Sequence, residues 1–186
     1  RFDEKTNTLL LVRKYQYAAG EPGISNNFIN ALFQDPKGKI WIGTENGLNA
    51  LAPGGTPEFY FEKDGLANDA IQSILSDDGE EVWVSTLQGL TRIKPGQKTD
   101  KVKNFDVNDG LLDNYFDDKA AASTSNGYFV FGGINGLNYF NPRAIKKDTI
   151  PPAIVISDFK LFNQSAPVGP WNGRKAILNK SISETG

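Results

Sequence analysis

Segment 112–118, which reads LDNYFDD, holds the side chains of this sequence best suited to bind a small polar ligand. Its amide and carboxylate groups can form hydrogen bonds, and its two aromatic rings offer faces on which a sugar ring can stack. The competing interpretation is that the aromatic rings cap a hydrophobic core and the aspartates are solvated. The candidate ligand-binding residues are Asn114, Tyr115, Phe116, Asp117 and Asp118.

Residue types that are absent exclude several kinds of chemistry. The 186 residues include no histidine and no cysteine, so the commonest general base, a thiol nucleophile and a thiolate metal site are all missing. The Asp-Gly segments 77–79 and 106–110 do not match a calcium-binding loop and are typical of turns. We therefore expect no catalytic residue, no metal site and no cofactor in this chain.

Composition narrows the possible partners. Hydrophobic residues make up 39% of the chain and aromatic residues 11%, which is enough to build a core. The net charge is -2 and no basic block occurs, so we expect no nucleic-acid partner. No apolar run approaches the roughly 20 residues of a membrane helix. Because methionine is also absent, we expect an internal fragment of a longer protein that meets a membrane only through a segment outside this chain.

The elements that must position any site belong to a repeat. Segments 39–51, 81–93 and 128–140 share one pattern: an apolar or aromatic run, a short polar turn, Gly-Leu and a second apolar run. Trp41 and Trp83 occupy equivalent positions in the first two copies. Positions that recur in a repeat serve the repeated structure, so we expect both tryptophans to pack in a core between repeats.

The spacing of the repeat is regular in its first two copies. Gly47 and Gly89 are 42 residues apart, and a second pair of equivalent glycines, Gly23 and Gly65, has the same separation of 42 residues. The third copy is longer, with 47 residues between Gly89 and Gly136. We expect a loop to have grown in that copy, where segment 112–118 enters it.

A period of roughly 40–45 residues with four short strands is typical of a β-propeller blade. Residues 9–17 are expected to form the last strand of an earlier blade. Because roughly four to eight blades close a ring, the sequence predicts an all-β fold of about three four-stranded blades within a larger propeller. The expected strands are 28–34, 39–44, 47–51 and 58–61, then 70–76, 81–86, 89–94 and 101–106, then 117–123, 128–132 and 136–140.

The proline-rich segment 149–152 interrupts the repeat. It is followed by an apolar run and a polar tail rich in turn residues. We therefore expect two parts: the C-terminal blades of a propeller at residues 1–148, and the incomplete start of a second β domain at residues 149–186.

The repeats resemble a known family. Residues 41–44 (WIGT), 46–48 (NGL) and 64–66 (DGL) are similar to the two-component regulator propeller repeat, and residues 151–163 resemble the opening of the Y_Y_Y domain, a β-sandwich. The resemblance implies the periplasmic sensor of a hybrid two-component system, homodimeric in the full-length receptor. Such a sensor detects glycan-derived oligosaccharides and passes the signal to a histidine kinase outside this chain.

Two alternatives stay open. The blades could form a structural or protein-binding module, or part of a carbohydrate-active propeller enzyme, since turn 35–41 resembles turns of sialidases. Sialidases also need clustered arginines, and of the five arginines in this chain only Arg92 lies in a repeated strand motif. We therefore expect this fragment to have no enzymatic activity.

Overall fold

The chain divides into two compact units, residues 1–145 and 146–186. The computed structural model describes residues 2–3, 8–9, 14–18, 23–76, 80–96, 101–145, 160–161, 163–165 and 168–170. In the second unit, β14 (Lys160–Leu161) pairs antiparallel with β15 (Gln164–Ser165). The predicted domain junction and nearly all of the segment that resembles the Y_Y_Y domain lie outside the described residues.

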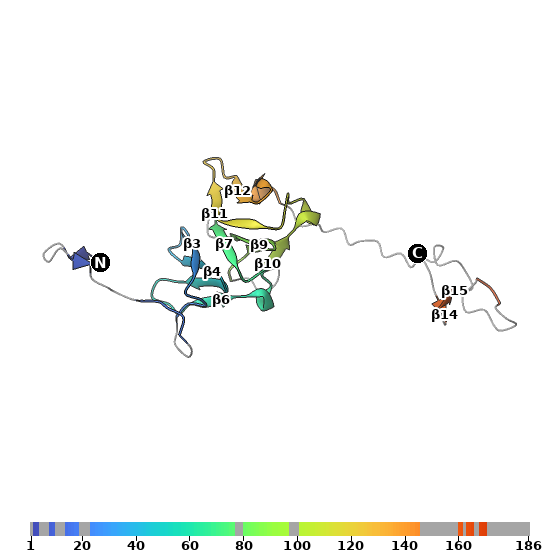
Figure 1. Cartoon of the computed structure of the whole chain (residues 1–186), viewed down its shortest axis with the longest axis horizontal. Helices are drawn as coiled ribbons and strands as arrows, with labels where there is room; N and C mark the ends of the chain where they lie inside the picture. The colour runs from blue at the N-terminus through green and yellow to red at the C-terminus, as the bar shows by residue number, and fades with distance from the viewer. Residues whose placement is uncertain are drawn as a thin grey trace. The chain divides into compact units, whose positions relative to one another are not determined.

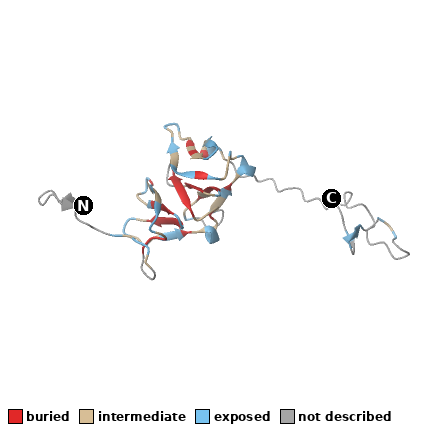
Figure 2. Cartoon of the chain, viewed as in Figure 1, coloured by how far each residue is buried: buried red, intermediate tan, exposed pale blue. Residues whose placement is uncertain are grey.

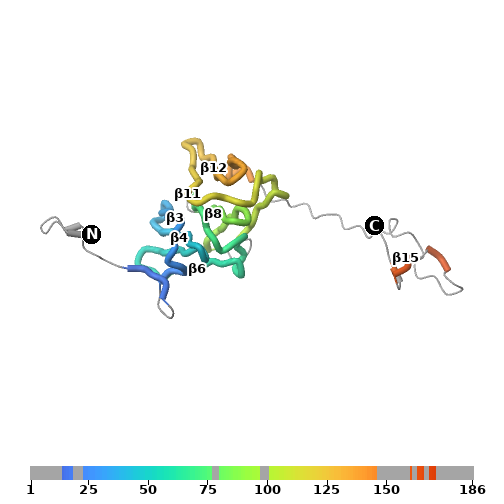
Figure 3. Tube along the Cα trace, viewed as in Figure 1, coloured from blue at the N-terminus to red at the C-terminus, as the bar shows by residue number. Residues whose placement is uncertain are grey.

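Three antiparallel sheets make up the described part of the first unit (Figure 1). Each sheet is a meander in which consecutive strands are neighbours, and the trace passes through the sheets in chain order (Figure 3). The first blade contains β3 (Ile29–Gln34), β4 (Ile40–Thr44), β5 (Gly47–Leu51) and β6 (Glu58–Tyr60); the second contains β7 (Ile71–Leu75), β8 (Val82–Thr86), β9 (Gly89–Ile93) and β10 (Val102–Phe105); the third contains β11 (Phe116–Ser123), β12 (Phe129–Gly133) and β13 (Gly136–Phe140). The predicted all-β fold is confirmed, and every predicted strand of the three blades ends within one residue of the observed strand.

The hairpin between the second and third strands of a blade explains the repeated glycine. Gly47 and Gly89 have φ angles of 106° and 116°, in the left-handed region that glycine adopts without a Cβ penalty. The hydroxyl of Thr86 donates to the Gly89 carbonyl at 2.8 Å and accepts from the Gln88 amide at 3.0 Å. The Gly89 amide donates to the carbonyl of Asn114 at 2.7 Å, so the hairpin is also linked to the segment that enters the next blade.

The Asp-Gly-Leu sequences form the connections between blades. A 3₁₀ turn, η1 (Glu62–Asp64), leads to Gly65, which has a φ of 109°. The carboxylate of Asp64 accepts a hydrogen bond from the Phe61 amide at 3.1 Å. The same arrangement recurs at η2 (Val107–Asp109), so these short motifs reverse the chain after the outer strand and return it to the next inner strand.

Turn 35–41 is held by a buried carboxylate. Asp35 is 5% exposed, and its Oδ1 accepts hydrogen bonds from the amides of Lys37 and Lys39 at 2.9 and 3.0 Å. Its Oδ2 accepts a hydrogen bond from the indole nitrogen of Trp41 at 3.0 Å. In the third blade the hydroxyl of Thr124 accepts from the Tyr128 amide in the corresponding turn. The carboxylate of Asp35 therefore joins its turn to the core.

The core consists of two clusters, one between each pair of adjacent blades (Figure 2). Trp41 is 0% exposed and Trp83 is 1% exposed, which confirms the expectation that both pack in the core. The first cluster combines Trp41, Leu48, Ala50 and Tyr60 of the first blade with Ile71, Ile74, Val82, Val84 and Ile93 of the second. The second combines Leu75, Trp83, Leu90 and Phe105 of the second blade with Phe116, Phe129 and Phe131 of the third.

The two end blades each present an open apolar face. Leu32 and Phe59 of the first blade are 68% and 42% exposed, and Leu137 and Tyr139 of the third blade are 58% and 53% exposed. In β12 and β13, the residues that alternate with these, such as Phe131, face the second blade and are buried. The second blade, by contrast, is covered on both faces.

The expected strand at residues 9–17 is wrong over its described second half. Strand β2 (Thr8–Leu9) pairs with β1 (Phe2–Asp3), and residues 14–18 belong to no strand. The backbone of Gln16 and Tyr17 instead makes single hydrogen bonds to Ile24 and Asn27 of the segment entering the first blade. These isolated contacts replace the continuous ladder that the repeat predicted.

Replacing Gly89 with alanine should destabilise the protein more than the same change at Gly54. A Cβ at Gly89 would lie 2.4 Å from the carbonyl oxygen of Phe105, whereas a Cβ at Gly54 would have nothing within 4 Å. Both glycines have positive φ, so Gly54→Ala measures the conformational cost alone, about 1 kcal/mol. Gly89→Ala adds a steric cost of about 1–3 kcal/mol. Urea unfolding followed by tryptophan fluorescence gives both values, and equal losses would contradict the repeat geometry.

Asp35→Ala should lower the free energy of unfolding by about 3 kcal/mol, because it removes three hydrogen bonds and leaves the buried Trp41 indole without its acceptor. Asp118→Ala is the control, since the Asp118 side chain is 57% exposed and the change should stay within about 0.5 kcal/mol. The same unfolding experiment checks both variants. A loss below about 1 kcal/mol for Asp35→Ala would show that the turn does not depend on its carboxylate.

Candidate functional site

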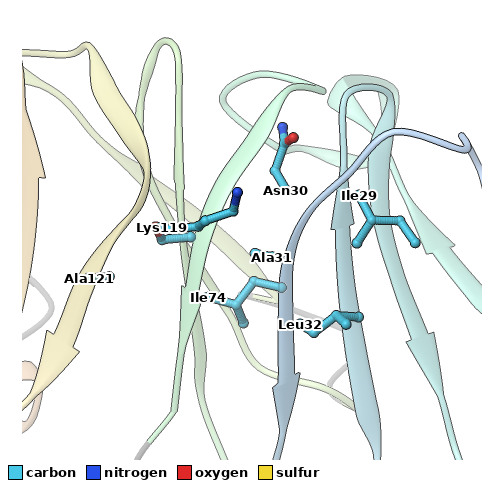
Figure 4. A pocket seen from close by; sticks show the side chains of 8 residues that line it. Ile29, Asn30, Ala31, Leu32, Ile74, Lys119 and Ala121 are labelled. Carbon is cyan, nitrogen blue, oxygen red and sulfur yellow. The ribbon is translucent and has the colours of Figure 1, made fainter.

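The first strands of the three blades come together. Strand β7 contacts both β3 and β11, and β3 also contacts β11. A pocket of about 400 Å³ lies among these inner strands (Figure 4). All three blades contribute to it, and its lining residues are Ile29, Asn30, Ala31, Leu32, Ser73, Ile74, Lys119 and Ala121.

Each inner strand carries a bulge at the same place. In the first two blades one extra residue, Asn30 or Gln72, interrupts the pairing with the second strand. In the third blade the four residues 117–120 lie opposite Gly132 alone. The third copy therefore has two more residues in its bulge than the others, which accounts for the 26 residues from Gly110 to Gly136 against 24 from Gly65 to Gly89. The growth predicted for the entering loop thus lies within β11.

The enlarged bulge places Lys119 at the pocket. Its φ angle is 57°, a left-handed conformation that costs a non-glycine residue about 1 kcal/mol. Its side chain extends from β11 toward Asn30 (Figure 4). Lys119 is the one charged residue among the eight that line the pocket. Its ammonium lies 3.4 Å from a carboxylate oxygen of Asp118, and both side chains are largely exposed.

Two neutral polar side chains face the same pocket. The amide nitrogen of Asn30 donates to Glu45 Oε1 at 2.7 Å and to the Ile71 carbonyl at 3.1 Å, which uses both of its hydrogens. Ser73 is 3% exposed, and its hydroxyl has no hydrogen-bond partner within the part of the chain that the structure describes. Ser85, its register partner on β8, is buried in the same condition but does not line the pocket. Buried hydroxyls usually have a partner, so Ser73 marks the pocket as a place for a polar group.

The structure separates the five residues predicted to bind ligand. The carbonyl of Asn114 accepts from the Gly89 amide, and its Oδ1 accepts from the Val107 amide at 2.9 Å. Phe116 is 1% exposed and packs edge-to-face on Phe131, so its ring is core, as the competing interpretation held. Tyr115 is 43% exposed at the start of β11.

The two aspartates of the predicted set, Asp117 and Asp118, are exposed on the enlarged bulge beside Lys119. They do not line the pocket. The structure therefore brings the predicted acidic residues near the candidate site and leaves the predicted aromatic residues outside it. Ligand binding by these residues stays a prediction.

Segment 112–115 is fixed to the hairpin of the third blade. The carboxylate of Asp113 accepts hydrogen bonds from the Tyr115 amide at 2.9 Å and from the side-chain amide of Asn135. These bonds, the one from Tyr115 first, hold the pKa of Asp113 below its ordinary value. The Leu112 amide donates to Asn138 Oδ1 at 2.9 Å. The segment thus sets where β11 begins, and so where the bulge falls.

Sequence reasoning missed three residues of the pocket: Asn30, Ser73 and Lys119. The extra length of the third copy was the available signal for Lys119, but it had to be assigned to the inner strand rather than to the loop before it. Asn30 stands at the one-residue bulge of its own blade. Ser73 is distinguished only by being buried without a partner, which no sequence pattern shows.

The residues that suggested an enzyme are used structurally. Asp35 is occupied by its turn, as described above. The guanidinium of Arg92 lies over the ring of Trp83 at 5.9 Å and 3.9 Å from Glu81, away from the pocket. No cluster of acidic residues able to hold a metal ion occurs within the described ranges. None of the helices described there is long and apolar enough to span a membrane.

Comparisons with known proteins agree with this architecture. The family model "Two component regulator propeller" matches residues 23–46. Histidine kinase P4 of Formosa agariphila is 27% identical over 87% of this chain and 15% of its own length. The extracellular domain of a hybrid two-component system from B. thetaiotaomicron has a TM-score of 0.68 and 26% identity, covering 86% of this chain and 22% of that domain.

A third similar protein extends the fold beyond two-component systems. PorZ, a surface component of the type-IX secretion system of Porphyromonas gingivalis, has a TM-score of 0.51 and 22% identity, covering 71% of this chain and 20% of PorZ. The chain spans less than a quarter of each of these relatives. Its repeats are two-component regulator propeller repeats, and in fold it corresponds to part of the extracellular domain of a two-component sensor.

Proposed function

We propose that this chain is part of the periplasmic sensor of a hybrid two-component system that detects glycan-derived oligosaccharides. The histidine kinase lies outside this chain, and the full-length receptor is a homodimer. The likeness to an extracellular two-component domain supports the sensor role. The observation that carries ligand detection is the pocket among β3, β7 and β11, where three blades contribute polar groups to one cavity.

The position of the pocket suggests how binding would become a signal. Asn30, Ser73 and Lys119 come from three different blades, so a ligand that contacts all three stabilises one arrangement of the blades over others. The blades are joined through the buried clusters of Trp41 and Trp83, which pass a small shift on as a movement of whole sheets. A shift in the relation of two sensor chains would then reach the kinase.

A structural or protein-binding module is the second candidate. The open apolar faces of the end blades, with Leu32 and Leu137 exposed, favour it. The two candidates differ in whether a small ligand stabilises the chain. Dimerisation in light scattering, without any response to oligosaccharides, would support the module.

The test is thermal unfolding of the chain against a panel of oligosaccharides from plant, algal and host glycans. Ligand at about 100 times its dissociation constant should stabilise the folded state by about 2.7 kcal/mol, a shift of several degrees in Tm. One panel member should produce this shift. No response to any oligosaccharide would contradict the proposal.

Ser73→Ala locates the response, and Ser85→Ala is its matched control. Each variant removes a buried hydroxyl that has no partner among the described residues, so the free energy of unfolding should stay the same or rise slightly. Only Ser73 lines the pocket, so Ser73→Ala alone should weaken binding of the panel member, by about fivefold in calorimetry for one lost hydrogen bond. Equal binding by both variants would place the ligand elsewhere.

A further inference from the structure

The charge of the pocket indicates what kind of ligand it takes. Among its eight lining residues, Lys119 is the one ionised group. Its ion pair with Asp118 is 3.4 Å long and joins side chains that are 74% and 57% exposed, so water and salt screen it strongly. The ammonium of Lys119 therefore stays available to an anionic group that enters the pocket.

The backbone at Lys119 supports a role for its side chain. Lys119 and Asn163 are the two non-glycine residues with positive φ in the described part, where ten glycines occupy the other such positions. Glycine at position 119 would adopt this conformation without strain. A lysine held in a strained bulge points to a function of the ammonium group.

The neutral groups complete a recognisable donor set. The Ser73 hydroxyl can donate to an anionic oxygen beside Lys119. Asn30 has committed both amide hydrogens, so its Oδ1 can only accept, for example from a ligand hydroxyl. A sugar that carries an acidic group next to a free hydroxyl matches this combination of two donors and one acceptor.

We propose that the inner-strand pocket is a subsite for an acidic sugar, in which Lys119 and Ser73 bind a carboxylate or sulfate group and Asn30 accepts a hydrogen bond from a neighbouring hydroxyl. The sugar part of this inference rests on the proposed function. The anionic part rests on Lys119 and Ser73, and it has a separate test.

The first experiment is calorimetry with two matched pairs of oligosaccharides. One pair is an oligogalacturonate and its carboxyl-reduced neutral form; the other is a sulfated galactan oligosaccharide and its desulfated form. The acidic member of at least one pair should bind at least tenfold tighter than its neutral partner, and the preference should fall as NaCl rises. The pair that responds identifies carboxylate or sulfate. Equal binding of acidic and neutral members, or binding of neutral panel members alone, would overturn the acidic subsite and leave the sensor proposal intact.

Two variants assign the preference to Lys119. Lys119→Gln should abolish the acidic preference, and Lys63→Gln, an exposed lysine in η1 outside this pocket, should keep it. Lys119→Gly should also abolish it while the urea midpoint stays unchanged or rises, because glycine relieves the positive φ. Retention of the preference by Lys119→Gln would overturn the assignment.

The second experiment uses inorganic sulfate alone, followed by amide chemical shifts, so that failure of the sugar proposal can be told apart. Sulfate should shift the amide signals of Ser73 and Lys119 in the wild type and leave them unmoved in Lys119→Gln. This result with no oligosaccharide binding would refute the sugar ligand and keep the anion subsite. No shift at either residue would refute the anion subsite itself.

Discussion

Strand β8 is buried on both of its faces, and the rest of the first unit depends on this. Val82 and Val84 pack toward the first blade, while Trp83 between them stacks on Phe105 and Phe140 on the side of the third blade. A single four-stranded sheet would leave one of these apolar faces in water. The free energy that orders each sheet therefore comes largely from its neighbours, and the blades are stable only as a stack.

The same packing positions the candidate site. The residues of the inner-strand pocket belong to three sheets that share no ladder hydrogen bonds, so only the clusters between blades set the distances among them. Each inner strand reaches the pocket with a bulge, and bulges redirect side chains without breaking the sheet. The third blade extends this device by two residues and so presents a charged group where the other blades present Asn30 and Gln72.

Much of the fold could be predicted because its determinants are local and repeated. Gly47 and Gly89 mark hairpins that need a positive φ, and Trp41 and Trp83 mark the strand that faces the next blade. The site was less predictable for a physical reason. Phe116 lies one residue from the exposed Tyr115 but points into the core, because side chains alternate along a strand and the register was unknown. The pocket itself unites residues from distant parts of the sequence, which no local pattern connects.

Hydrogen exchange measured by mass spectrometry tests the dependence of the blades on one another most directly. The comparison is between the wild type and Trp83→Ala, which opens a cavity between the second and third blades. The account predicts that amides in β8, β9 and β12 lose protection together, and that β4 and β5 of the first blade lose protection as well, because the second blade supports them. Loss of protection confined to the third blade, with the first and second unchanged, would contradict a cooperative stack of blades.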